Sequence, residues 1–86
     1  MTYFWQEGYP IMVQADGAGY PCYIAWDWFS GKHAILEIID RWVVSDPWAE
    51  AWEKRTYFSV VTETGIALII FFNRVTQEWY IQWVFD

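Results

Sequence analysis

The sequence predicts a small all-β domain with one short helix, in which about six antiparallel strands form a meander. The meander is either a strongly twisted sheet or a small, partly open barrel. Two observations predict this class: turn-forming residues recur at short intervals, and the segments between them are rich in β-branched and aromatic residues. A third, the length of 86 residues, assigns residues 1–86 to a single domain.

The first two strands are predicted at Pro10–Ala15 and Pro21–Phe29. Asp16–Gly19 separates them as a turn, because glycine accepts a positive φ without penalty. Pro21 stands at the start of its strand, where its missing N–H does little harm. Ser30-Gly31 is then predicted to form a tight hairpin turn to the third strand.

The third strand is predicted at Lys32–Val44, with alternation through Ala34, Leu36 and Ile38. A helix is the alternative for this segment. Four large residues there also recur at helical spacing: Ile35, Ile38, Ile39 and Trp42. The aromatic strand and Ser-Gly turn that precede the segment favour the strand.

A short amphipathic helix or ordered loop is predicted at Pro47–Lys54. Asp46 is a favourable N-cap, and proline is well tolerated at the first helical position. Trp48 and Trp52 would share one face and lie on the sheet.

The last three strands form the clearest part of the meander, at Arg55–Thr62, Gly65–Phe72 and Glu78–Phe85. In Glu78–Phe85, one face of a period-two pattern carries Trp79, Ile81, Trp83 and Phe85. Gly65–Phe72 has no polar side chain, so both of its faces must be covered. It should therefore be a central strand, or a strand of a barrel wall with a partner outside.

The aromatic content predicts a binding surface. The chain carries eight Trp, six Tyr and six Phe, which is more than the interior of so short a chain can hold. Rings left at the surface usually mark an interface. The net charge of −6 disfavours binding to a nucleic-acid backbone, which needs clustered Lys and Arg.

A cytoplasmic location is expected, because Cys22 is the single cysteine and rules out an intramolecular disulfide. The first eight residues lack the features of a signal peptide. The longest apolar run, Ile66–Phe72, is too short for a membrane-spanning helix, so no membrane partner is expected.

Neither a catalytic site, a metal site nor a cofactor is predicted. Cys22 and His33 are too few for a structural zinc site, which takes four ligands, and no Cys–His catalytic signature accompanies them. A small enzyme or ligand-binding barrel is a third hypothesis, with a mouth lined by four polar residues: Asp27, His33, Glu37 and Asp40.

The candidate interaction residues combine Trp with Arg, the residue types most enriched at binding hot spots. They are Arg41, Trp42, Trp48, Trp52, Arg55, Trp79 and Trp83. The alternative role for Trp42, Trp48 and Trp52 is to close the open end of the sheet as part of the core. Asp40 would then pair with Arg41 or Arg55.

An ordered series of short motifs runs through residues 10–86: Pro10-Ile11-x-Val13, Gly19-x-Pro21, Trp26, Gly31-Lys32, Ile39-Asp40-Arg41-Trp42, Trp48, Arg55-x-Tyr57-Phe58-x-Val60-x-Thr62-x-x-Gly65 and Glu78-Trp79-Tyr80-x-x-x-Val84-Phe85-Asp86. In this series the chain resembles a small bacterial domain of unknown function. That domain occurs alone and at the C-terminus of Y-family, error-prone DNA polymerase-like proteins. The resemblance implies a non-catalytic, β-rich adaptor linked to translesion synthesis or DNA repair.

The chain departs from that family where members carry Arg around the hairpin and the Trp-rich segment. Here those stretches read Ala25-Trp26-Asp27-Trp28-Phe29 and Trp42-Val43-Val44. The loss of cations weakens a DNA-contact role and favours an apolar interface.

The functional prediction is a binding or adaptor module that acts through an exposed aromatic surface. Its expected partner is another protein or a second copy of the chain, as a homodimer. The alternative is a binder of single-stranded nucleic acid that uses Arg41, Trp42, Trp48 and Arg55 as a stacking platform.

Overall fold

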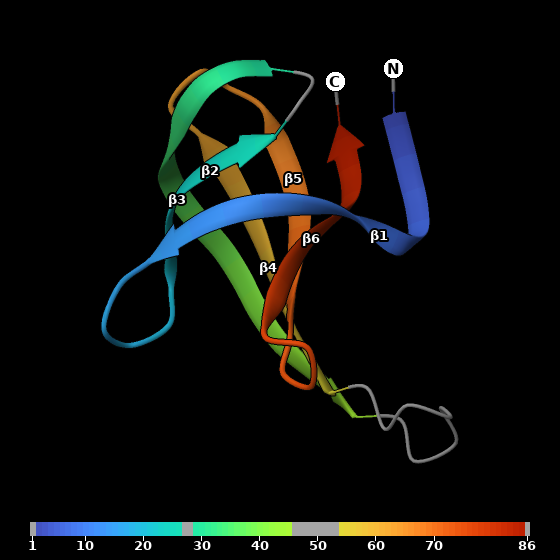
Figure 1. The fold of residues 1–86 in the computed structure, drawn as a ribbon. Coiled ribbons are helices and arrows are strands. Elements are labelled where there is room, and N and C mark those ends of the chain that lie inside the picture. The colour runs from blue at the N-terminus through green and yellow to red at the C-terminus, as the bar shows by residue number, and fades with distance from the viewer. Residues whose placement is uncertain (1, 27–28, 46–53, 86) are drawn as a thin grey trace.

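The computed structural model describes residues 2–26, 29–45 and 54–85 and shows an all-β protein (Figure 1). Each strand is antiparallel to the next along the chain, and the last pairs with the first, so that the sheet closes on itself into a barrel. The strands are β1 (Thr2–Ala15), β2 (Pro21–Trp26), β3 (Phe29–Ser45), β4 (Lys54–Thr62), β5 (Ala67–Asn73) and β6 (Glu78–Phe85). The predicted six-stranded antiparallel meander is confirmed, and its ring is closed.

Two long strands bend to close this ring. The first part of β1 pairs with β6 up to Ile11, and the part from Met12 onward pairs with β2. In the same way, β3 pairs with β2 up to Ala34 and with β4 from Ile35 onward. The six-residue β2 thus joins two strands that are more than twice its length.

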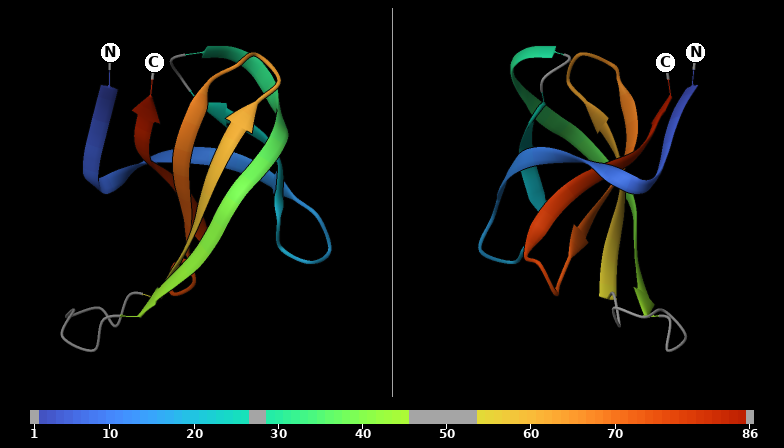
Figure 2. Two further views of the ribbon diagram at one scale, coloured as in Figure 1. Left: turned by 180° about the vertical axis from the view of Figure 1, so that it is seen from behind. Right: turned by 45° about the vertical axis from the view of Figure 1, so that its right-hand side comes forward.

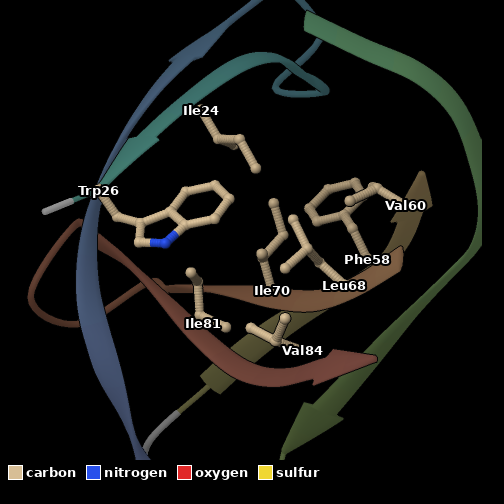
Figure 3. Close-up of a cluster of buried hydrophobic side chains, with 8 residues drawn as sticks. All are labelled: Ile24, Trp26, Phe58, Val60, Leu68, Ile70, Ile81 and Val84. Atoms are coloured by element: carbon tan, nitrogen blue, oxygen red, sulfur yellow. The ribbon is translucent and has the colours of Figure 1, made fainter. Parts of the chain in front are cut away.

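The core fills the inside of the ring (Figure 3). Strands β2, β4 and β5 each contribute two alternate side chains, and β6 contributes two that a register shift places three positions apart. The eight buried members are Ile24, Trp26, Phe58, Val60, Leu68, Ile70, Ile81 and Val84. These apolar side chains leave the interior filled rather than hollow.

The predicted turn at Ser30-Gly31 is wrong. Phe29 pairs with Trp26, so both turn residues lie within β3. The next pair is Ile24 with His33, which leaves three residues of β3 opposite one residue of β2. Gly31 takes a φ of 86° at this bulge. The positive φ that glycine permits is therefore used by an irregular strand and not by a hairpin loop.

The segment 32–44 is a strand, as predicted, but its expected alternation is wrong. Two bulges interrupt the pairing with β4, one between Ile35 and Glu37 and one between Ile38 and Asp40. Ile35 and Ile38 therefore pack on the core, while Leu36 turns to the solvent.

The prediction that one face of β6 carries Trp79, Ile81, Trp83 and Phe85 is wrong, because a bulge interrupts the strand. The register shifts across Gln82, so that Trp79 and Ile81 face the core whereas Trp83 lies on the outside with Phe85. The four rings and side chains expected on one face are thus divided between two.

The first strand begins at Thr2, eight residues before its predicted start at Pro10. The turn predicted at Asp16–Gly19 is present, and further turns at Glu63–Gly65 and Asn73–Gln77 connect β4 to β5 and β5 to β6. The helix predicted at Pro47–Lys54 falls on residues outside the described part, apart from Lys54, which begins β4. Across the described residues, the structure contains no helix long and apolar enough to cross a membrane.

Candidate interaction surface

The outside of the ring carries an apolar surface across β3, β4, β5, β6 and the first part of β1. These five strands lie side by side in the left view of Figure 2. Side chains of a strand alternate between its two faces, so the residues between the core positions point outward. We call eight of them the outer wall: Phe4, Leu36, Ile39, Val61, Ala67, Ile69, Trp83 and Phe85.

The strand registers place the outer wall in two rows. Val61, Ala67 and Phe85 are successive partners in the upper row. In the lower row Ile69 pairs with Trp83, and Trp83 pairs with Phe4. The lower row crosses β4 at Ser59, and the β3 partners of Val61 and Ser59 are Glu37 and Asp40. Leu36 and Ile39, the extra residues of the two β3 bulges, lie beside these two carboxylates.

Four members of the outer wall are largely exposed to solvent. Leu36 is 70% exposed, Ile39 59%, Phe4 49% and Phe85 41%. Trp83 lies between two of them, with its ring 4.4 Å from that of Phe4 and 5.7 Å from that of Phe85. The wall therefore combines an aromatic side at β1 and β6 with an aliphatic side at β3.

Below the wall, four rings form a cross-strand aromatic ladder. Trp42, Tyr57, Phe71 and Tyr80 are successive partners on β3 to β6, and their ring centroids are 5.1–5.3 Å apart. Cross-strand aromatic pairs of this kind stabilise a sheet.

The middle of the aromatic ladder is covered by the chain itself. The guanidinium carbon of Arg55 lies 4.4 Å from the Phe71 ring centre, and its Nη1 donates a hydrogen bond of 3.2 Å to the Tyr57 hydroxyl. From the other side, Gly8 of β1 approaches Phe71 and Tyr80. Phe71 is consequently 0% exposed although it points outward.

The predicted interaction residues occupy several different surroundings. Trp83 belongs to the outer wall and Trp42 to the aromatic ladder, and Arg55 covers the middle of the ladder. Arg41 lies at the end of the ring, with its guanidinium 5.9 Å from the ring centres of both Tyr20 and Phe58. Trp79 packs against the core, with its ring 5.6 Å from that of Phe58. Trp48 and Trp52 lie outside the described residues.

The polar residues proposed for a ligand-binding mouth are not gathered at one place. His33 packs beside Trp26, with 5.3 Å between the ring centres. Glu37 and Asp40 are exposed positions of β3 that pair with Val61 and Ser59. Asp27 lies outside the described residues. No group of three metal-ligating side chains occurs within the described part of the chain.

Two shallow grooves flank β1 away from the outer wall. One, of about 230 Å³, runs between β1 and β2 and is lined mainly by Met12, Tyr23 and Lys32. The Lys32 ammonium lies 4.2 Å from the Tyr23 ring centre there. The other, of about 310 Å³, lies between β1 and the start of β6, beside Trp79. Both are open, and neither gathers titratable groups that could perform chemistry.

Sequence reasoning missed Phe4, Leu36, Ile39 and Phe85 as surface residues. The predicted alternation put Leu36 on one face with Ala34 and Ile38, and Ile39 entered only the alternative helical spacing. The signal that could have found them was the repetition of apolar residues at spacings of three in Ile35–Trp42.

Comparisons with protein-family models, curated proteins and solved structures find no match for this chain. The resemblance to the domain of Y-family polymerase-like proteins therefore stays a prediction from the sequence.

Proposed function

We propose that this protein is a non-catalytic interaction module that self-associates through its outer wall. The observation that supports it most is the exposure of Leu36 and Ile39, two large aliphatic side chains at the bulges of β3. Neither contributes to the core. Burying them against another molecule would recover hydrophobic free energy that the single chain leaves unused.

The rest of the outer wall supports the same function. β5 has no polar side chain between Ala67 and Phe72. Its inner face packs in the core, and its outer face carries Ala67 and Ile69. The neighbouring aromatic trio of Phe4, Trp83 and Phe85 provides large rigid rings of the kind that interfaces favour. A two-fold dimer requires a surface that can match a second copy of itself, and the outer wall would meet its own copy in such a dimer.

The direct test is to make the wall polar without disturbing the core. The double variant Leu36→Gln/Ile39→Gln alters two exposed side chains, so the fold should keep its circular dichroism spectrum. We expect its dimerisation constant, measured by sedimentation equilibrium, to weaken about 100-fold or more, because each dimer loses four aliphatic contacts.

The matched control is Met12→Gln/Val75→Gln. Met12 is 77% exposed in the groove beside β2, and Val75 is 59% exposed in the turn between β5 and β6. It makes the same number of apolar-to-Gln changes away from the outer wall and should dimerise like the parent. Equal weakening in both variants would overturn the assignment of the surface.

Binding of single-stranded nucleic acid has less support. Arg41 and Trp42 are neighbours in a strand and so point to opposite faces of β3. Arg55 is already engaged by Tyr57 and Phe71, and these two rings are buried. The aromatic ladder thus offers few open ring faces on which bases could stack.

A further inference from the structure

The beginning of β1 lies at one margin of the sheet, beside the end of β6 (Figures 1 and 2). Residues 2–4, which we call the β1 arm, pair with β6, whereas β1 pairs with β2 only from Met12 onward. Of the described strands, only β2 and β6 lie beside β1. The β1 arm therefore has one edge on β6 and one open edge.

A hydrogen bond and the strand registers show which main-chain groups face β1 from β6. Thr62 N–H donates to Ile66 O at 2.9 Å, so Ile66 faces β4. Main-chain groups alternate in direction along an antiparallel strand, so those of the next residue, Ala67, face β6. Ala67 pairs with Phe85, which therefore faces β5. The main-chain groups of Val84 consequently face β1.

The same alternation gives the direction of the main-chain groups along the β1 arm. Val84 pairs with Tyr3, so the N–H and C=O of Tyr3 bond to β6. The N–H and C=O groups of Thr2 and Phe4 then point to the open edge. A row of such groups can accept the strand of another molecule.

The β1 arm carries none of the features that usually protect an open edge, such as charged side chains, proline or a bulge. Its side chains are Thr, Tyr and Phe, and its pairing with β6 is regular at residues 2–4. Beyond Phe4 the register shifts, and the Gln6 carbonyl accepts a hydrogen bond of 3.4 Å from the Gln82 side chain. The regular open edge is thus confined to residues 2–4.

A second open edge, on β3, is protected. Among the described strands, β3 pairs with β4 alone beyond Ala34, and alternation directs the main-chain groups of Trp42 to β4 and those of Arg41 and Val43 away from it. Asp40 Oδ1 accepts a 2.8 Å hydrogen bond from the Arg41 N–H on this edge. An incoming strand would have to displace a charge-assisted bond and approach a carboxylate. Strand addition is therefore favoured at the β1 arm.

A second copy of the β1 arm matches this edge. A two-fold axis midway between the two Tyr3 residues makes the arms antiparallel and pairs Thr2 of each copy with Phe4 of the other. Each of these pairs exchanges both of its N–H···O=C bonds. The two Tyr3 side chains then face each other, and each already stacks on Trp5 with ring centroids 6.2 Å apart. No charged side chains oppose each other in this register.

We infer that the β1 arm binds the same arm of a second copy as an antiparallel strand and joins the two sheets edge to edge. This contact goes beyond the proposed function, because it uses the margin of the sheet whereas the outer wall uses its face. A pair of three-residue strands buries far less surface than the roughly 1,200 Å² of a stable interface. The dissociation constant of the arm contact is therefore expected to be roughly 0.1–1 mM.

Opposite charges placed at Tyr3 test the pairing and its register. The background is the variant Leu36→Gln/Ile39→Gln, in which the outer wall is weakened. Tyr3→Lys and Tyr3→Glu each bring like charges together at the two-fold axis, so each should weaken dimerisation by roughly tenfold at low salt. An equimolar mixture of the two variants pairs opposite charges and should associate roughly tenfold more tightly than either alone, as measured by sedimentation equilibrium.

Tyr23 provides the matched control, because it is 39% exposed and Tyr3 is 38% exposed. Tyr23 lies in the groove beside β2, away from the β1 arm. Tyr23→Lys and Tyr23→Glu in the same background should dimerise like the background, and mixing them should bring no gain.

Amide hydrogen exchange shows which edge pairs. As the concentration of the background variant rises towards 1 mM, on the order of the expected dissociation constant, exchange of the Phe4 amide should slow. Exchange of the Val43 amide, on the open edge of β3, should keep its rate. Slower exchange at Val43 and not at Phe4 would overturn the inference in favour of the β3 edge.

The failure of this inference is distinguishable from a failure of the proposed function. The arm contact is overturned if the mixed Tyr3 variants associate no more tightly than either alone, or if the background variant stays monomeric at about 1 mM. The proposed function fails instead if the parent dimerises no more tightly than the Leu36→Gln/Ile39→Gln variant at micromolar concentration.

Discussion

At the residue scale, Gly8 shows how one position holds the outer aromatic ladder in place. Its φ is 90°, and a Cβ built there would lie 2.6 Å from the Tyr80 Cβ and 2.7 Å from the Phe71 Cζ. The register of β1 with β6 is irregular between Phe4 and Tyr9, so Gly8 lies in the bend that lets β1 pass so close to the ladder. Only glycine meets both requirements.

Replacing Gly8 should therefore destabilise the protein more than replacing another glycine of positive φ. We expect Gly8→Ala to lower the free energy of unfolding by about 2–5 kcal/mol, from the unfavourable φ together with overpacking. Gly19→Ala is the control, because Gly19 has a φ of 88° but no atom near the position that a Cβ would occupy, and it should cost about 1–2 kcal/mol. Chemical denaturation measures both, and equal losses would contradict the packing role of Gly8.

At the element scale, β3 explains why the sequence fitted both a strand and a helix. Each bulge adds one residue to the strand, so the residues directed to the inside fall at Ile35 and Ile38, three positions apart. Spacing of three resembles the helical period, although the segment is extended throughout. The existence of the strand could be predicted from its composition and neighbouring turns. Its bulges depend on closure of the ring, and the spacing of three alone does not distinguish a bulged strand from a helix.

A further prediction concerns the edge of β3 that points away from β4. Along this edge the Asp40 side chain accepts a hydrogen bond from the Arg41 N–H. Asp40→Ala removes the acceptor of the Arg41 N–H and exposes an edge flanked by apolar side chains. We expect this variant to form larger assemblies with time, seen by light scattering and thioflavin fluorescence.

Asp40→Asn is the matched variant, because its side-chain oxygen can still accept the hydrogen bond. It should remain as well dispersed as the parent. If Asp40→Ala behaves in the same way as the parent, the carboxylate has no guarding role.

At the scale of the whole molecule, the excess of rings predicted an outward-facing surface, and the structure places Tyr3, Phe4, Tyr20, Tyr23 and Phe85 in exposed positions. The segment Gly65–Phe72, which has no polar side chain, likewise predicted a strand covered on both faces. The location of the candidate surface could not be predicted, because it depends on which faces the bulges assign to Leu36, Ile39 and Trp83. It also needs the registers that align these residues across five strands.

Sedimentation velocity of the unaltered protein over a range of concentrations decides whether the chain self-associates. The chain has a mass of 10.4 kDa. We predict that a species of twice that mass replaces the monomer as the concentration rises through the micromolar range. A single species of 10.4 kDa at high micromolar concentration would show that the outer wall does not pair with a second copy.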